Sequence, residues 1–300
     1  MGKGKVKVLT ARQAADLIKD GDTVTLSGFV ANGIAEALNT AAEERFLETG
    51  HPRDLTLFWV AGTGNKDGSH ADHYAHEGMV KKVIGGHFNF VPKICEMLSE
   101  NKIEGYNVPQ GAIAQMLRDN AAHKVGTISH VGIGTFADPR NGGGRLSEKT
   151  KEDIVKIIEL EGQEQLFYPR IPLDVAFIRG TYADELGNIT LEKEMAPLDA
   201  TSQAMAVHNN GGLVVVQVER VVKAGHLDPK LVKIPGIYVD AVVECPADDP
   251  KQSQSINCTY DPAYAGNTQV PVSSLEPKKL DAKKIIGRTF NNSIYINTRN

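Results

Sequence analysis

Short apolar segments alternate with amphipathic ones along most of this chain, and this alternation constrains the fold more than any other feature. The segments with the character of buried strands are Thr23–Ser27, Leu55–Val60, Lys82–Gly85, Val125–Ile128, Val175–Ile178 and Leu213–Val218. Between them lie the predicted helices Ala11–Lys19, Gly33–Phe46, Pro92–Asn101, Gln110–Asn120 and Leu198–His208. Strands that are apolar throughout and separated by helices are typical of a parallel sheet. We therefore expect an open α/β fold, with a mostly parallel sheet and helices on both faces.

Composition narrows the partners that such a fold could have. The 300 residues are 41% hydrophobic and 23% charged, which is the balance of a globular protein. A formal net charge of −4 offers no general basic field, so we expect no nucleic acid and no membrane as partner. The three cysteines are far apart, which argues against a disulfide scaffold. No apolar run has the length of a membrane span or the form of a secretory signal, and we expect a cytoplasmic protein.

Two glycine-rich loops are the first candidates for a binding site. Ser27-Gly-Phe-Val-Ala-Asn-Gly-Ile34 joins a predicted strand to a predicted helix, and ligands of open α/β folds bind at the carboxyl ends of strands. Gly28 and Gly33 would let the backbone approach a ligand, but a plain tight turn would need glycine equally. Gly62-Thr-Gly-Asn-Lys-Asp-Gly68 matches neither a dinucleotide fingerprint nor a P-loop. We interpret it as a surface loop that lines a ligand cleft.

The densest group of potential metal ligands is the segment His70-Ala-Asp-His-Tyr-Ala-His-Glu77. On a helix, His73 and Glu77 would share one face, with His70 and His76 beside them. This spacing does not match a standard zinc site, so we predict no metal here. The segment is interpreted as a helix that faces solvent or an interface.

Two further turns could carry polar contacts to a ligand. Tyr106-Asn-Val-Pro-Gln-Gly111 runs from a strand end into a helix, where the amide of Gln110 could donate to a carbonyl or an oxyanion. The same residues could form only a helix cap and a proline-set turn. The long loop Val131–Gly144 contains five glycines and Arg140, which could bind a carboxylate or phosphate or could simply pair with Asp138.

Together, five ordered segments resemble the family I CoA-transferases, and most closely the single-chain acetate/propionate CoA-transferases. The segment from Asp20 to Ala35 is similar to the family's amino-terminal signature, with Thr25, Ser27 and Ala35 in place of an apolar residue, a glycine and a proline. The other similar segments are Tyr106–Gly111, Gly132–Arg140, Arg179–Asn188 and Val214–Arg220. The resemblance covers about residues 5 to 288 and implies the fold of the family's amino-terminal domain.

The resemblance implies a ping-pong reaction that moves CoA between short-chain acyl-CoA and a small carboxylic acid. A glutamate carboxylate would form an anhydride and then a glutamyl-CoA thioester, with coenzyme A as substrate and no separate cofactor. Gln110 would contact the glutamyl group or its oxyanion. The remaining residues implied to bind substrate are Gly28, Phe29, Val30, Ala31, Asn32, Gly33, Asn107 and Gly111.

The departure from the family pattern that matters most is the missing nucleophile. In the family the nucleophilic glutamate lies in a second half, within a Glu-x-Gly motif. The only such triplets here begin at Glu48, which ends a predicted surface helix, and at Glu185, which lies in a polar turn. No residue is assigned as the nucleophile, and we expect the chain to be inactive alone.

The resemblance also sets the expected domain boundaries. Residues 1–270 form the amino-terminal, alpha-type domain, 271–288 a linker toward a missing second half, and 289–300 a tail outside the family. Within this region, residues 246–279 have the composition of an extended wrap or linker. Three hypotheses stay open: a truncated or frame-shifted half, an alpha-type subunit that needs a beta-type partner, or a non-catalytic module that binds acyl-CoA or a sugar phosphate. We also expect self-association into a homo-oligomer.

Overall fold

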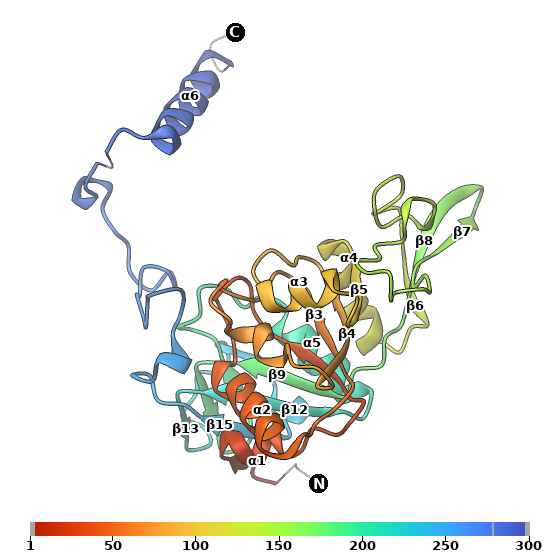
Figure 1. Cartoon of the computed structure of the whole chain (residues 1–300). Coiled ribbons are helices and arrows are strands. Elements are labelled where there is room, and N and C mark those ends of the chain that lie inside the picture. The colour runs from red at the N-terminus through yellow and green to blue at the C-terminus, as the bar shows by residue number, and fades with distance from the viewer. Residues whose placement is uncertain (1–3, 278, 298–300) are drawn as a thin grey trace.

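The computed structural model describes residues 4–277 and 279–297, and its centre is a sheet of eight strands (Figure 1). Every pair of neighbours in this sheet is parallel, as predicted. The strands in spatial order are β1 (Lys7–Leu9), β15 (Ala241–Glu244), β12 (Leu213–Val218), β9 (Val175–Arg179), β2 (Thr23–Leu26), β3 (Leu55–Trp59), β4 (Val80–Gly85) and β5 (Glu104–Asn107).

The order of the strands reverses between β2 and β9. From β2 the chain moves outward through β3 and β4 to β5, and from β9 it moves in the opposite direction through β12 to β15. The connections therefore leave the two central strands on opposite sides. In open α/β sheets such a reversal opens a crevice at the carboxyl ends of the strands, and ligands bind there.

Helices cover both faces of the sheet, which confirms the predicted architecture. The helices α1 (Ala11–Ala15), α2 (Glu36–Thr49) and α3 (Pro92–Ser99) pack on one face, and α4 (Gln110–Ala121) and α5 (Ala200–Asn209) pack on the other. Successive residues of β3 show the alternation: Leu57 and Trp59 join the core under α2, whereas Phe58 joins the core under α4.

Two smaller sheets extend this core. One has the order β13 (Arg220–Val222), β10 (Tyr182–Asp184), β11 (Ile189–Thr190) and β14 (Val232–Ile234). The other is antiparallel, with the order β6 (Gly126–Ser129), β8 (Gln163–Pro169) and β7 (Lys156–Leu160), and stands out from the main body in Figure 1. The expectation that Val125–Ile128 is one of the buried strands was wrong, because β6 pairs with β8 in this outer sheet and Val125 is 81% exposed.

The chain beyond β15 contains no further strand among the described residues. It passes through two short 3-10 helices, η4 (Pro250–Gln252) and η5 (Val272–Ser274), and then forms α6 (Ala282–Asn297), which stands away from the body in Figure 1. Within the segment 246–279, Ser253, Gln254 and Asn267 make hydrogen bonds to the body. The expected boundary between residues 288 and 289 falls inside α6, and the domain boundaries stay predictions. Residues 1–3, 278 and 298–300 of the predicted segments lie outside the described residues.

No helix in the described part of the chain combines the length and the apolar character that a membrane span would need.

Candidate functional site

The predicted loop from Gly28 to Gly33 follows β2 and lies at the point where the strand order reverses. Phe29 and Asn32 exchange backbone hydrogen bonds of 2.9 Å in both directions, which closes a tight turn. Gly28 has φ of 124°, and a Cβ there would lie 1.9 Å from Cδ1 of Ile34, so only glycine fits. Gly33, with φ of 66°, also requires the left-handed region that favours glycine.

The second glycine-rich loop packs directly on the first. The Val30 N–H donates to the Gly62 carbonyl oxygen at 2.6 Å, and the Gly64 N–H donates to the Val30 carbonyl oxygen at 3.0 Å. The loops after β2 and β3 therefore form one rim at the carboxyl edge of the sheet. This arrangement fits the interpretation that Gly62–Gly68 lines a cleft, since Asn65 and Asp67 from this loop line the cavity described below.

Gln110 continues the same rim as the first residue of α4. A Cβ built on Gly86, which follows β4, would lie 2.2 Å from the Val60 carbonyl oxygen and 3.1 Å from Cβ of Gln110, so these segments are in close contact. Gln110 and Gly111 are both exposed at this edge. A Cβ on Gly111 would meet no atom within 4 Å, so packing among the described residues does not require glycine there.

Asn107 ends β5 and is held by the long loop instead. Its N–H donates to the Gly144 carbonyl oxygen at 2.7 Å, and its side-chain Oδ1 is buried without a partner among the described residues.

Between the two open readings of Arg140, the structure favours pairing: its guanidinium meets Asp138 at 2.8 Å and Glu164 at 3.2 Å. The Arg140 hydrogen bonds hold the pKa of Asp138 well below its usual range.

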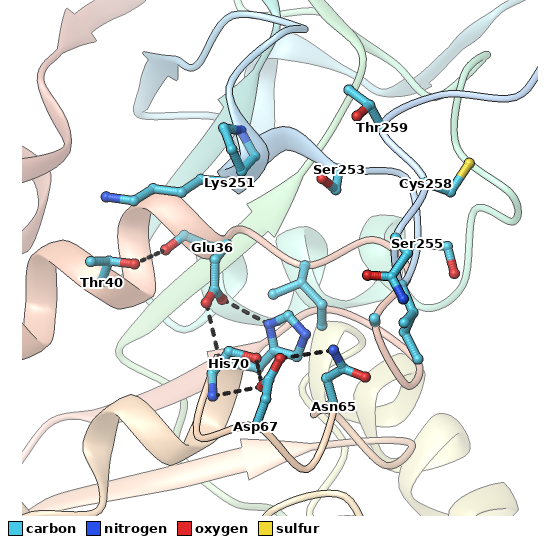
Figure 2. A pocket seen from close by; sticks show the side chains of 16 residues that line it. Glu36, Thr40, Asn65, Asp67, His70, Lys251, Ser253, Ser255, Cys258 and Thr259 are labelled. Carbon is cyan, nitrogen blue, oxygen red and sulfur yellow. Dashed lines mark hydrogen bonds and ion pairs between the residues drawn. The ribbon is translucent and has the colours of Figure 1, made fainter.

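A cavity of about 660 Å³ opens beside the Gly28–Gly33 loop (Figure 2). Ala31 and Ile34 form its apolar side, Glu36 and His70 lie at its base, and residues 250–259 of the carboxyl-terminal wrap close the opposite side. Figure 2 shows the carboxylate of Glu36 directed at the His70 ring, with Asn65 and Asp67 next to it. The cavity is built from segments that are more than 180 residues apart in the chain.

The histidine-rich segment was predicted to be a helix facing solvent or an interface, and this prediction was wrong. It forms a single 3-10 turn, η1 (His70–Tyr74), that packs against α2. The carboxylate of Asp72 accepts the N–H groups of Lys93 and Ile94 at the start of α3, which anchors the turn. Glu77 does not share a face with His73 but pairs with Lys102 at 2.6 Å.

The histidines instead form an alternating array with two glutamates of α2. His70 Nδ1 meets Glu36 at 2.8 Å, and the other oxygen of Glu36 meets His73 Nε2 at 2.8 Å. His73 Nδ1 then contacts Glu43, whose second oxygen meets His76 Nε2 at 2.7 Å. The array runs from the cavity, where His70 is buried, to the surface, where the His76 side chain is 29% exposed.

The contacts within this array shift the pKa values of Glu36 and His73. Burial acts to raise the pKa of Glu36, but the hydrogen bonds with His70 and His73 outweigh it and lower that pKa to about 2. Burial acts to lower the pKa of His73, yet its contacts with Glu36 and Glu43 outweigh burial and raise that pKa. Glu36 is therefore an ionised acceptor at neutral pH, and both of its oxygens are occupied by imidazole rings.

Sequence reasoning did not single out Glu36, and it considered His70 only as a potential metal ligand. Glu36 follows Gly33 by three residues and begins α2, so its position after the glycine loop was the available signal. The two glutamates that begin Glu-x-Gly triplets lie elsewhere: Glu48 pairs with Arg12 near the end of α2, and Glu185 pairs with Lys5 at 2.7 Å. Neither lines the cavity.

A parallel α/β sheet with a strand-order reversal, bordered by glycine loops and a helix start, is the arrangement in which open α/β proteins bind small molecules. The family model described as Coenzyme A transferase matches residues 8–245. The chain belongs to the coenzyme A transferase family.

Known relatives agree with this assignment. Acetate CoA-transferase YdiF of Escherichia coli K12 is 45% identical over 253 residues, which are 84% of this chain and 47% of the relative. The crystal structure of the YdiF apoenzyme from Escherichia coli O157:H7 matches with a TM-score of 0.85 at 41% identity, over 90% of this chain and 52% of that one. The chain therefore spans about half the length of these relatives.

A shorter relative has a different layout. The acetate CoA-transferase subunit alpha of Escherichia coli K12 is 27% identical over 239 residues, which are 80% of this chain and 97% of that subunit. The matched region thus corresponds to a half of the longer relatives and to nearly all of a separate subunit.

Proposed function

We propose that this chain supplies the amino-terminal, alpha-type half of a CoA-transferase that moves CoA between a short-chain acyl-CoA and a carboxylic acid of the acetate/propionate class. The observation that carries the proposal is the exposed rim at the carboxyl edge of the sheet. There the loop Gly28–Gly33 and the start of α4 at Gln110 lie on one side of the crevice, with Phe29, Gln110 and Gly111 exposed.

In the proposed reaction the nucleophile comes from outside this chain. A glutamate carboxylate of the second half would attack the thioester carbonyl and release the CoA thiolate, leaving an acyl–glutamyl anhydride. The thiolate would then attack the glutamyl carbonyl and displace the first carboxylic acid, giving glutamyl-CoA; a second acid would reverse these steps. Glu36 is an unsuitable nucleophile because both of its oxygens accept hydrogen bonds from histidine rings.

In that reaction this chain would stabilise the developing oxyanion and enclose the acyl group. The amide of Gln110 and the first N–H groups of α4 are available to a developing oxyanion, because a helix start leaves its N–H groups unpaired. The loop Gly28–Gly33, whose backbone is held by the Phe29–Asn32 turn, would wall the acyl group. No step assigned to this chain requires a metal or an organic cofactor.

Reconstitution tests the proposal. The chain is incubated with acetyl-CoA and propionate, alone and with the second half of a full-length relative supplied in trans, and propionyl-CoA is measured by mass spectrometry. We expect turnover only in the reconstituted mixture. Propionyl-CoA formed by the isolated chain would contradict the missing-nucleophile argument, and no turnover in any mixture would contradict the proposed function.

Gln110→Ala then tests the rim within the reconstituted enzyme. Loss of one oxyanion donor should lower kcat by roughly 10²-fold. Gln115→Ala is the matched control, because Gln115 lies five residues further along the same helix, is also exposed, and its amide donates to Asp119. Equal turnover in the two variants would remove Gln110 from the site and leave the turn before α4 as an ordinary helix entry.

A further inference from the structure

His70 lines the cavity and has one buried ring nitrogen without a partner among the described residues. The residue is 8% exposed, and its Nε2 has no hydrogen-bond partner among the described residues. Buried polar side-chain atoms in native proteins are nearly always paired, so an unpaired one needs an explanation. Its position in the lining of the 660 Å³ cavity indicates that a ligand supplies the missing partner.

The contact with Glu36 determines what kind of partner fits. Glu36 is ionised and can only accept, so Nδ1 of His70, at 2.8 Å, carries the proton. In the tautomer with its single proton on Nδ1, the lone pair lies on Nε2, which makes this atom an acceptor for an N–H or O–H group. His73 holds the other oxygen of Glu36 at 2.8 Å and so keeps the carboxylate in place.

The backbone at His70 is itself held in a costly conformation. Its φ of 63° lies in the left-handed region, which a residue with a side chain adopts only when the surrounding structure imposes it. Such conformations cluster at ligand-binding positions. Here it accompanies a ring that lines the cavity, with one nitrogen on Glu36 and the other without a partner among the described residues.

The rest of the lining favours an uncharged ligand. Glu36 and Asp67 place two carboxylates in the lining and Lys251 places one ammonium group there, and the excess of negative charge disfavours an anion. Most of the other polar groups are neutral hydroxyls and amides: Thr40, Asn65, Ser69, Ser253, Ser255 and Thr259. The volume lies within the range of about 300–1,000 Å³ that is typical for drug-sized ligands and is much larger than a two-carbon acid needs.

We infer that this cavity binds an uncharged, hydrogen-bond-donating ligand segment through Nε2 of His70, with Glu36 as the residue that positions the ring. Under the proposed function, on which this identification rests, the segment is the pantetheine arm of acyl-CoA. Its amide and hydroxyl groups are uncharged donors, unlike the phosphates at the other end of CoA. Ala31 of the Gly28–Gly33 loop lines the same cavity, so an arm bound there would run toward the proposed acyl wall.

The inference is tested on the full chain with pantetheine as the probe. Binding is measured by calorimetry, and the ¹⁵N resonances of the histidine rings are followed by NMR. Pantetheine should move the Nε2 resonance of His70 and leave Nδ1 nearly unchanged. His70→Phe should weaken binding roughly tenfold, the scale for losing one hydrogen bond, whereas His70→Gln, which keeps an acceptor, should recover most of it.

His226→Gln is the matched control, since His226 is exposed and does not line the cavity; it should bind pantetheine as the unmodified chain does. Glu36→Gln tests the positioning role, because an amide can donate to Nδ1 and allow the other tautomer. The Nδ1 and Nε2 resonances of His70 should then exchange character, and pantetheine affinity should fall. A purely structural role would lower stability without this exchange.

Three results would overturn the inference: no pantetheine binding, equal affinity of the unmodified chain and His70→Phe, or a propionate-induced shift of Nε2 at lower concentration than pantetheine needs. These outcomes are separate from those of the proposed function. CoA transfer in the reconstituted enzyme, without the expected pantetheine-induced shift of the His70 Nε2 resonance, would refute the inference but not the proposed function. Absence of transfer would refute the proposed function, while the binding measurement would still decide the inference.

Discussion

Two groups of charged side chains flank the strand-order reversal: one is an arginine–glutamate pair, and the other is an array of glutamates and histidines. Arg179, at the end of β9, pairs with Glu194 at 3.1 Å, and both side chains are 3% exposed. On the other side, Glu36 begins the array with His70 and His73, which becomes gradually more exposed toward His76. Arginine keeps its proton at any pH that a protein survives, whereas imidazole and carboxylate titrate within that range.

Arg179 helps to hold the carboxyl-terminal wrap, whereas the array lies at the base of the cavity. Besides Glu194, Arg179 donates to the Ser253 carbonyl oxygen of the carboxyl-terminal wrap. Two buried amides fasten the same wrap: Gln217 donates to the Lys251 carbonyl oxygen at 2.9 Å, and Gln254 donates to the Lys193 carbonyl oxygen at 2.6 Å. One wall of the cavity is thus held by hydrogen bonds to backbone carbonyl oxygens, which do not titrate, and the base by contacts between side chains that do.

Breaking the buried pair should have the largest effect. Arg179→Leu leaves the Glu194 carboxylate buried without its partner and should lower the free energy of unfolding by about 3–5 kcal/mol. Urea unfolding followed by circular dichroism measures the change. Arg220→Leu is the control, because Arg220 is exposed and should change stability by less than about 1 kcal/mol. Similar losses in both variants would show that burial does not distinguish them.

Acid should weaken the array by protonating Glu36, whereas Arg179 keeps its proton. The pKa of Glu36 is lowered to about 2 in the folded chain, so its contribution is complete above the unfolded pKa, near 4.5, and is lost as pH falls toward 2. The shift corresponds to about 3 kcal/mol. Urea unfolding between about pH 6 and pH 3 should show a steeper loss in the unmodified chain than in Glu36→Gln. Parallel profiles would contradict the prediction.

Base should act on the middle of the array. The pKa of His73 is raised, so the stability it contributes is present below its ordinary value, near 6.5, and is lost as pH rises through the raised value. We expect an NMR titration of His73 with a midpoint above 6.5, and Glu43→Gln should lower that midpoint and cost about 1–2 kcal/mol at neutral pH. A midpoint that the variant leaves unchanged would exclude Glu43 as the cause.

The exposed end of the array should matter least. His76→Gln removes the contact with Glu43 at 2.7 Å, where the imidazole is 29% exposed and water can replace it. The expected loss is below about 1 kcal/mol, as for other solvent-accessible pairs. Urea unfolding at neutral pH would measure it, and a loss equal to that of Glu43→Gln would mean that the array acts as one cooperative unit.

The sequence predicted most of the central sheet correctly, for a physical reason. The strands that lie inside a parallel sheet are apolar on both faces, as in Leu213–Val218, and this pattern is visible without any tertiary information. The edge strands β1 and β5, Lys-Val-Leu and Glu-Gly-Tyr-Asn, were missed because neither is apolar throughout, and the four-residue β15 was also missed. The strand near Val125 was placed in the wrong environment because local pattern does not name a strand's partner.

The candidate site was predicted only in part, because local sequence patterns do not show which distant residues come into contact. The loop Gly28–Gly33 and the Gln110 turn were visible because glycine permits turn conformations that other residues avoid and proline fixes φ. Their substrate contacts, and the role of Gln110, stay predictions. The histidine segment was misread because helical periodicity relates His73 to Glu77, four residues away. Its actual partners, Glu36 and Glu43, lie 37 and 30 residues earlier in the chain.

The sequence by itself determined the α/β class, the glycine loop at the end of β2 and the absence of a Glu-x-Gly nucleophile in a suitable setting, because local backbone geometry and residue identity decide these. Only the tertiary structure decided that Arg140 pairs with Asp138 and Glu164, and that the wrap at Ser253 closes a cavity over His70. Such contacts depend on which distant segments the sheet brings together. That is set by packing and strand order, which no local pattern in the chain encodes.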